Sequence, residues 1–196
     1  MKSVYNFVVT PKGERYNNKK KVGDSELILN TEIFNHQYVN REAIVISTPI
    51  VGDTDIKTGD TVIVHHNVFR RWNDIRGEEK NSKSFFNEST YIISLDQIFL
   101  YKTRDKWKAP KGYCFVQPLE CEDKFNIDNE KPLMGIIKYT DNQFKIGSLV
   151  GFCPSSEYEF IIDGQRLYRV LSNLITIEYE HQGNEKTYNP SWAQGS

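Results

Sequence analysis

Side chains able to do chemistry occur at several places in this 196-residue chain, without the spacing of a known catalytic or metal-binding motif. His65 and His66 are metal-ligating types, but neighbouring strand residues point to opposite faces, so we do not expect them to share an ion. Asp53 and Asp55 stand in a segment typical of a turn, where carboxylates are solvated. No nucleophile elbow, zinc-protease, P-loop or dinucleotide-binding motif occurs. The sequence therefore predicts a protein that is not an enzyme and holds no metal or cofactor.

The cysteines and the charge balance bear on compartment and partners. Cys114, Cys121 and Cys153 are odd in number and form no CxxC pair, which favours a reducing compartment without disulfides. No apolar run is long enough to span a membrane, and the N-terminus lacks the apolar region of a signal peptide. The formal net charge of -1 gives no general reason to expect nucleic acid or an anionic membrane as partner. These features predict a cytoplasmic protein with neither partner.

One polar segment mixes basic and aromatic residues, as nucleic-acid-binding surfaces do. Arg70, Arg71 and Trp72 stand together, with further basic residues after them. Acidic residues at 74, 78 and 79 interrupt this pattern. We therefore interpret 70–84 as a solvated loop or a contact between subunits.

The aliphatic triplet Leu27, Ile28 and Leu29 lies inside a long polar stretch. The preceding residues, 14–24, are charged and hydrated, and they bury too little apolar surface to offset the entropy of ordering. We expect this segment to be mobile. An apolar triplet in such a loop is typical of a peptide that docks in a partner's groove. A short buried strand is the other interpretation, and these residues alone do not decide between the two.

The order of expected elements is that of an all-β protein. Aromatic and β-branched residues are plentiful, and Gly, Asn and Asp interrupt the chain at short intervals. In the first half we expect strands at 4–10, 41–47, 56–64, 91–93 and 98–101. The continuous apolar run 43–46 predicts burial on both faces of its strand.

The same pattern begins again after a basic segment, 102–112, which we interpret as a linker. Strands are expected at 113–118, 133–139, 144–152, 166–170 and 172–179, with Gly147 in the place of Gly59. In the last of these, Ile175, Ile177 and Tyr179 alternate with polar residues, which predicts one buried face. Two copies of one strand order predict an internal duplication. The polar tail 181–196 is expected to be flexible.

Taken in this order, the residues resemble the GroES-type co-chaperonins, and 4–101 are similar to a whole subunit of that family. The resemblance is carried by the triplet Leu27-Ile28-Leu29, the strand 41–46, the segment Lys57-Thr58-Gly59-Asp60-Thr61-Val62-Ile63-Val64, and Ser94-Leu95-Asp96-Gln97-Ile98. Residues 113–180 look like a second, degenerate copy, as in the tandem co-chaperonins of chloroplasts. The degree of divergence is similar to that of phage-encoded members.

This resemblance implies two GroES-like small β-barrels in tandem, at 1–101 and 113–180, with a mobile loop at about 14–37. It also implies a homo-oligomeric ring that caps a GroEL-type chaperonin through Leu27, Ile28 and Leu29. The partner would bind the ATP, and the pair would assist folding of unfolded client proteins such as capsid proteins. For a phage-encoded member, the compartment would be the host cytoplasm.

The chain departs from the family pattern in three places. Glu26 stands where the family has a Gly before the triplet, and 47–57 is too short for the hairpin that roofs the ring. The insertion 70–84 has no counterpart in the family. An alternative function is therefore a non-enzymatic structural or adaptor module, of a virion or another oligomeric assembly, that keeps the GroES-like fold. A protease-resistant segment at 25–31 would favour this alternative.

Overall fold

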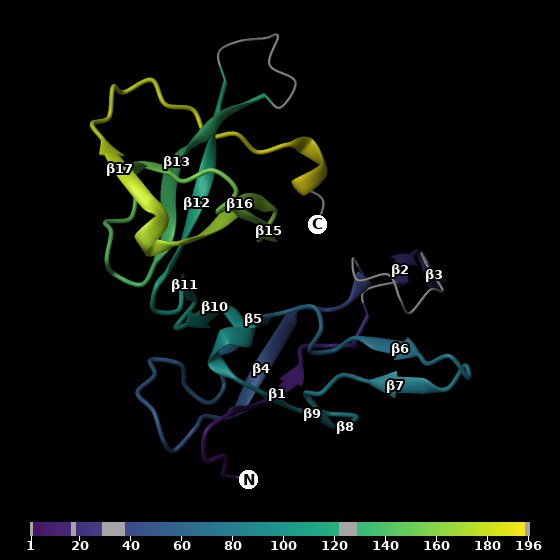
Figure 1. Ribbon diagram of the computed structural model, residues 1–196. Coiled ribbons are helices and arrows are strands. Elements are labelled where there is room, and N and C mark those ends of the chain that lie inside the picture. The colour runs from purple at the N-terminus through teal and green to yellow at the C-terminus, as the bar shows by residue number, and fades with distance from the viewer. Residues whose placement is uncertain (1, 17–18, 29–37, 122–128, 195–196) are drawn as a thin grey trace. The chain divides into compact units, whose positions relative to one another are not determined.

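Antiparallel β-sheets make up both halves of the protein, which is all-β as the sequence predicted (Figure 1). The computed structural model describes residues 2–16, 19–28, 38–121 and 129–194. The chain forms two compact units, Met1–Trp107 and Lys108–Ser196. Each unit has a sheet and a core of its own.

The first unit is built on a seven-stranded sheet in the order β11-β10-β5-β4-β1-β9-β8. Two further pairs, β2-β3 and β6-β7, form separate two-stranded sheets. The strands of this unit are β1 (Phe7–Pro11), β2 (Lys19–Val22), β3 (Ser25–Ile28), β4 (Glu42–Ser47), β5 (Thr61–Val64), β6 (Arg71–Asn73), β7 (Glu79–Asn81), β8 (Phe85–Asn87), β9 (Thr90–Ile93), β10 (Ile98–Thr103) and β11 (Lys106–Lys108). A 3-10 turn, η2 (Leu95–Gln97), joins β9 to β10.

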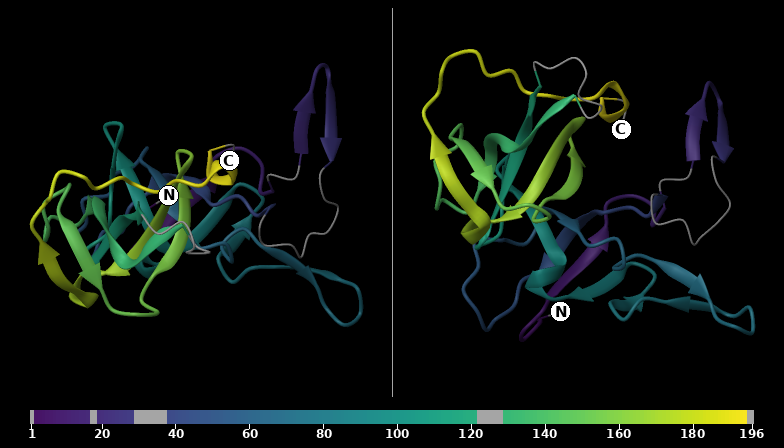
Figure 2. Two further views of the ribbon diagram at one scale, coloured as in Figure 1. Left: turned by 90° about the horizontal axis from the view of Figure 1, so that it is seen from above. Right: turned by 45° about the horizontal axis from the view of Figure 1, so that its top comes forward.

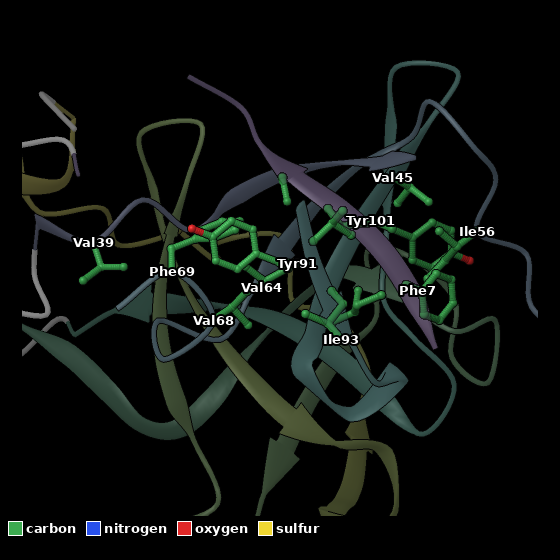
Figure 3. Close-up of a cluster of buried hydrophobic side chains, with 14 of the residues drawn as sticks. Phe7, Val39, Val45, Ile56, Val64, Val68, Phe69, Tyr91, Ile93 and Tyr101 are labelled. Carbon is green, nitrogen blue, oxygen red and sulfur yellow. The ribbon is translucent and has the colours of Figure 1, made fainter. Parts of the chain in front are cut away.

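One face of this sheet covers the core of the first unit. Along β4, Ala43 and Val45 are buried whereas Ile44 and Ile46 are 36% and 42% exposed. The prediction that this strand is buried on both faces is therefore wrong, because only its alternate residues reach the core. Figure 3 shows the buried cluster, in which β-branched residues surround several aromatic rings. The rings of Phe69 and Tyr91 meet edge to face, with 4.7 Å between their centroids. This arrangement is favourable because the positive edge of one ring faces the negative face of the other.

The second unit has a six-stranded sheet in the order β15-β16-β12-β13-β14-β17. Its strands are β12 (Tyr113–Glu120), β13 (Glu130–Thr140), β14 (Leu149–Phe152), β15 (Tyr158–Ile162), β16 (Gln165–Leu171) and β17 (Ile175–Tyr179). The 3-10 turns η3 (Ser172–Leu174) and η4 (Ser191–Ala193) precede β17 and end the described chain. Buried aliphatic and aromatic residues of β12, β13, β14 and β16 form its core.

Both units connect their strands in the same way. The strands β1, β4, β5, β8, β9 and β10 occupy the same places in the first sheet as β12 to β17 do in the second. The turn before the third strand is also repeated, since Gly59 and Gly147 both have φ +92°. The Gly59 amide donates to the Val45 carbonyl at 2.8 Å, and the Gly147 amide donates to the Ile137 carbonyl at 2.8 Å. A left-handed φ of this kind favours glycine, so the two turns are equivalent in geometry and in residue type.

Several segments differ from the sequence-based expectation. Part of the expected loop 70–84 forms the ribbon β6-β7, which extends beyond the edge of the seven-stranded sheet (Figure 2). The expected linker 102–112 instead holds the end of β10, a turn at Arg104 and Asp105 with positive φ, and β11. Along β17, Ile177 and Tyr179 are 49% and 37% exposed, so the face expected to be buried is only partly covered.

The tail is the largest correction, because the described part of 181–196 packs on the second unit instead of being flexible. Thr187 forms a bridge with Leu119 of β12, and the Tyr188 amide donates to the Pro118 carbonyl at 2.8 Å. The Asn189 side chain donates to the Gly164 carbonyl at 2.9 Å, and Ala193 is fully buried. Polar residues hold this tail through backbone pairing, which hydrophobicity does not reveal.

Gly135 provides a test of the packing between β12 and β13. A Cβ built there would lie 2.5 Å from Cγ1 of Val116 and would also clash with the backbone carbonyl oxygen of Gln117. We expect Gly135→Ala to lower the free energy of unfolding of the second unit by about 1–3 kcal/mol, the usual cost of overpacking. Chemical denaturation measures this change. Lys138→Ala on the same strand is the control, and equal loss in both variants would contradict the tight approach.

Candidate functional site

The first two residues of the predicted docking triplet lie in a β-hairpin. Strand β2 pairs with β3 in the register Lys19 with Ile28, Lys20 with Leu27, and Val22 with Ser25. Gly23, with φ +61°, stands in the turn, where a left-handed conformation is needed. Within the described residues, β2 and β3 pair with no other strand. Isolated two-stranded hairpins are marginally stable in water, so we expect this element to have little stability of its own.

Apolar side chains are exposed on one face of this hairpin. Val22 and Leu27 are 57% and 55% exposed. The pairing register and the period of two place both on the same face. Ile28 is the last residue of β3, and Leu29 lies outside the described residues. The hairpin therefore offers a small apolar surface that a partner can cover.

Charged side chains accompany that apolar surface. The ammonium of Lys19 is 3.2 Å from a carboxylate oxygen of Glu14 and 3.7 Å from one of Glu26. The hydrogen bond to Glu14, and then the charges of both carboxylates, raise the pKa of Lys19. These exposed pairs contribute little to stability.

Tyr16, Val39 and Asn40 hold together the two ends of the long segment that carries the hairpin, and we call these three residues the neck. Tyr16 and Val39 form an antiparallel bridge, and both side chains are buried. The buried side chain of Asn40 donates to the carbonyls of Lys12 and Glu14 at 3.0 and 2.8 Å. Its own oxygen accepts from the Glu42 amide at 2.9 Å. One amide side chain thus satisfies three backbone groups where β1 and β4 separate, which fixes both ends of the segment.

The residues around β6 and β7 hold this neck from the side. The Arg71 amide donates to the hydroxyl of Tyr16 at 2.8 Å. The guanidinium of Arg15 donates to the Phe69 carbonyl at 3.1 Å and to the Asn81 side chain at 2.8 Å. The same guanidinium lies 5.5 Å from the centre of the Tyr91 ring, within the range of a cation–π interaction. The segment 70–84 therefore contacts Arg15 and Tyr16, at the start of the long segment that carries the hairpin.

The two adjacent histidines lie differently from the sequence-based expectation. His65 and His66 follow the end of β5, in a turn closed by the Val68 amide donating to the His65 carbonyl at 2.9 Å. Their ring centroids are 4.2 Å apart, so the prediction of opposite faces is wrong. The alternation of a strand does not apply beyond its last residue. Asp53 and Asp55 are exposed in the loop before β5.

The three cysteines are free, in different surroundings. Cys114 is buried in the core of the second unit, and its thiol contacts the Val170 carbonyl at 3.6 Å. Burial raises the pKa of Cys114 to about 12, so this thiol stays protonated at neutral pH and is a poor nucleophile. Among the described residues, no group of three His, Cys, Asp or Glu side chains is arranged to hold a metal ion.

Comparisons with known proteins leave the site to be interpreted from its own geometry. No protein-family model matches the chain, and no curated protein matches it in sequence. Within the described part of the chain, no helix has the length and apolar character needed to cross a membrane. The structure places the predicted residues Leu27 and Ile28 in β3, and their docking role stays a prediction. Sequence reasoning missed Arg15 and Asn40, whose partners are distant in the chain.

Asn40 is the residue on which the neck depends most directly. We expect Asn40→Ala to lower the free energy of unfolding of the first unit by about 2–3 kcal/mol, because three backbone groups lose a buried partner. Chemical denaturation followed by tryptophan fluorescence measures the change. Asn67→Ala, at an exposed position of the same unit, is the control and should have little effect. Equal stability of the Asn40 variant and the parent protein would contradict this account of the neck.

Proposed function

We propose that this protein is a non-enzymatic co-chaperonin with two GroES-like barrels in tandem. It caps a GroEL-type chaperonin and assists the folding of client proteins, capsid proteins among them. The chaperonin binds and hydrolyses the ATP. In this proposal the protein acts in the cytoplasm, that of the host if a phage encodes it. Leu27, Ile28 and Leu29 form the contact with the chaperonin.

The observation that carries the proposal is the exposed apolar face of the β2-β3 hairpin above a rigid neck. Val22 and Leu27 are more than half exposed. Their burial would be favourable only in a complex, since no other described strand pairs with the hairpin. The neck fixes both ends of the segment through Asn40, so the hairpin can adapt to a partner while its base stays in place.

The free energies of burial and of ordering predict weak binding by one hairpin and strong binding by several hairpins together. Full burial of one aliphatic side chain contributes about 1.5–3 kcal/mol. Ordering a segment on binding costs about 2–5 kcal/mol. One hairpin therefore binds weakly, whereas a ring that presents several hairpins binds well through effective concentration. Weak individual contacts also permit release during an ATP-driven cycle.

Exposed edge strands support the ring that this proposal requires. Strand β17 is an edge of the second sheet, and its Ile177 and Tyr179 are 49% and 37% exposed. An edge strand has unpaired backbone groups that can join a strand of another copy. Pairing of this kind between copies would cover the apolar side chains and satisfy the backbone at once.

One observation favours the alternative of a structural or adaptor module. Residues 19–28 are paired in a hairpin, whereas the co-chaperonin family docks through a mobile loop. If the hairpin stays folded and unbound in the presence of a chaperonin, the same exposed face would serve a contact within a virion or another assembly.

The docking contact is tested by substitution in the hairpin. We expect Leu27→Ser and Ile28→Ser each to abolish capture by GroEL in the presence of ATP or ADP, because each removes an aliphatic side chain that binding would bury. The melting temperature of Leu27→Ser should stay close to that of the parent protein, since Leu27 is 55% exposed. A docking role requires the same of Ile28→Ser. A pull-down and a thermal melt on the same samples measure both properties.

Ile75→Ser is the matched control. Ile75 is a fully exposed aliphatic residue between β6 and β7, outside the hairpin. Its loss should leave capture unchanged. Failure of the parent protein to bind the chaperonin would contradict the proposal, and resistance of residues 19–28 to trypsin would then favour the structural module. A strong fall in melting temperature for Ile28→Ser would instead identify that residue as core.

A further inference from the structure

A groove of about 700 Å³ lies in the first unit beside β6 and the 3-10 turn η2, and its lining includes no residue of the hairpin and none of Tyr16, Val39 and Asn40. This volume is typical of small-molecule sites. The groove is lined by Asn67, Arg70, Trp72, Asn73, Ser82, Lys83, Ser84 and Gln97. The lining combines two cations, an indole ring and several amide and hydroxyl groups, and it contains no carboxylate.

The floor of the groove is held by hydrogen bonds within the protein. The hydroxyl of Ser82 donates to the Val68 carbonyl at 2.5 Å, and the Gln97 side chain donates to the hydroxyl of Ser84 at 3.3 Å. The Ile92 amide donates to the Ser84 carbonyl at 2.7 Å, which ties this floor to β9. The groove is therefore formed by a fixed surface before any ligand binds.

Three other side chains that line the groove do not make such hydrogen bonds within the described residues. Across the described ranges, no hydrogen bond, ion pair or ring contact occupies the side chains of Arg70, Trp72 or Lys83. The Nε of Arg70 has no hydrogen-bond partner among the described residues, and its side chain lines the groove. The guanidinium is therefore available to an anion, for which it is the preferred side chain.

The acidic residues of the β6-β7 ribbon do not neutralise these cations. The carboxylate of Glu79 pairs with Arg71 at 3.2 Å. Those of Asp74 and Glu78 pair with Lys80 at 3.5 and 2.8 Å. Hydrogen bonds from the Arg76 and Glu78 amides, first among the causes, lower the pKa of Asp74, so it stays charged and engaged in its turn. The acids that interrupt the basic pattern in the sequence are thus paired outside the groove, and its own positive charge remains.

We propose that this groove binds a nucleotide, with the phosphate on Arg70 and Lys83 and the base against Trp72. A guanidinium fits phosphate oxygens in a two-pronged geometry, and an ammonium adds a point charge. An indole stacks on the face of any base. The amides of Asn67 and Asn73 supply the donors and acceptors that bases use. The nucleotide is either free or part of a single strand, and the chemistry of recognition is the same in both cases.

The test is calorimetric titration of the full chain with adenosine monophosphate, inorganic phosphate, a short thymidine oligonucleotide and glucuronic acid. Adenosine monophosphate should bind saturably and more tightly than phosphate, and it should quench tryptophan fluorescence. Arg70→Gln should weaken binding by roughly tenfold or more, since it removes a charge-assisted hydrogen bond. Trp72→Phe should remove the quench, although Trp107 and Trp192 remain.

Arg76→Gln is the matched control, because it removes the same charge from the same segment, 70–84, but lies outside the groove. Its binding should be unchanged. If Arg70→Gln does not fold, Lys83→Gln at an exposed position carries the test, with a severalfold loss expected.

Tighter binding of the oligonucleotide would indicate a single strand as the source, and equal binding a free nucleotide. Absence of binding, an equal loss in Arg76→Gln, or equal affinity for glucuronic acid would overturn the proposal. The hairpin is not involved, so chaperonin capture and nucleotide binding can fail separately.

Discussion

The pairing of β1 with β4 across a long intervening segment is the constraint on which the first unit depends. These strands exchange hydrogen bonds from Val8 to Pro11, and the chain then leaves the sheet. Where the two strands separate, backbone amides and carbonyls have little access to water and would lack hydrogen-bond partners. Asn40 supplies those partners, and the Tyr16–Val39 bridge closes the opening above it. Because the bridge closes the end of the sheet, the chain can carry the charged hairpin outside it without exposing the core of the first unit to water.

The second unit has the same strand order as the first but lacks a long segment between its first two strands. Its strands follow the same order, and its third strand is entered through an equivalent glycine turn. Between β12 and β13 the chain has only residues 121–129, against 12–41 between β1 and β4. The first unit therefore carries the long inserted segment, while the second presents the exposed edge β17 and is covered by its own C-terminal tail. In the proposed function, docking would therefore fall to the first unit and contact between copies to the second.

Local patterns in the sequence predicted the fold class and most strands of the two sheets. The apolar run 43–46 and the apolar pair Ile92-Ile93 are local signals, and strands are present at both places. The hairpin at 19–28 has a local turn signal, Gly23-Asp24, but its flanks are rich in Lys and Glu, which are depleted in strands, so the sequence did not predict the pairing. The neck and the tail could not be predicted in this way. The partners of Asn40 are 26 and 28 residues away, and the tail pairs with β12 through backbone groups that any sequence would supply.

Hydrogen exchange of the free protein and of its mixture with a nucleotide-bound chaperonin tests the central claim most directly. The amides of 19–28 should exchange quickly in the free protein, because the hairpin pairs with no other described strand, and slowly in the complex. The Asn40 amide, which donates to the Arg15 carbonyl at 2.9 Å, should exchange slowly in both. Hairpin amides that exchange at the same rate with and without chaperonin, or a neck as labile as the hairpin, would contradict a docking element on a fixed base.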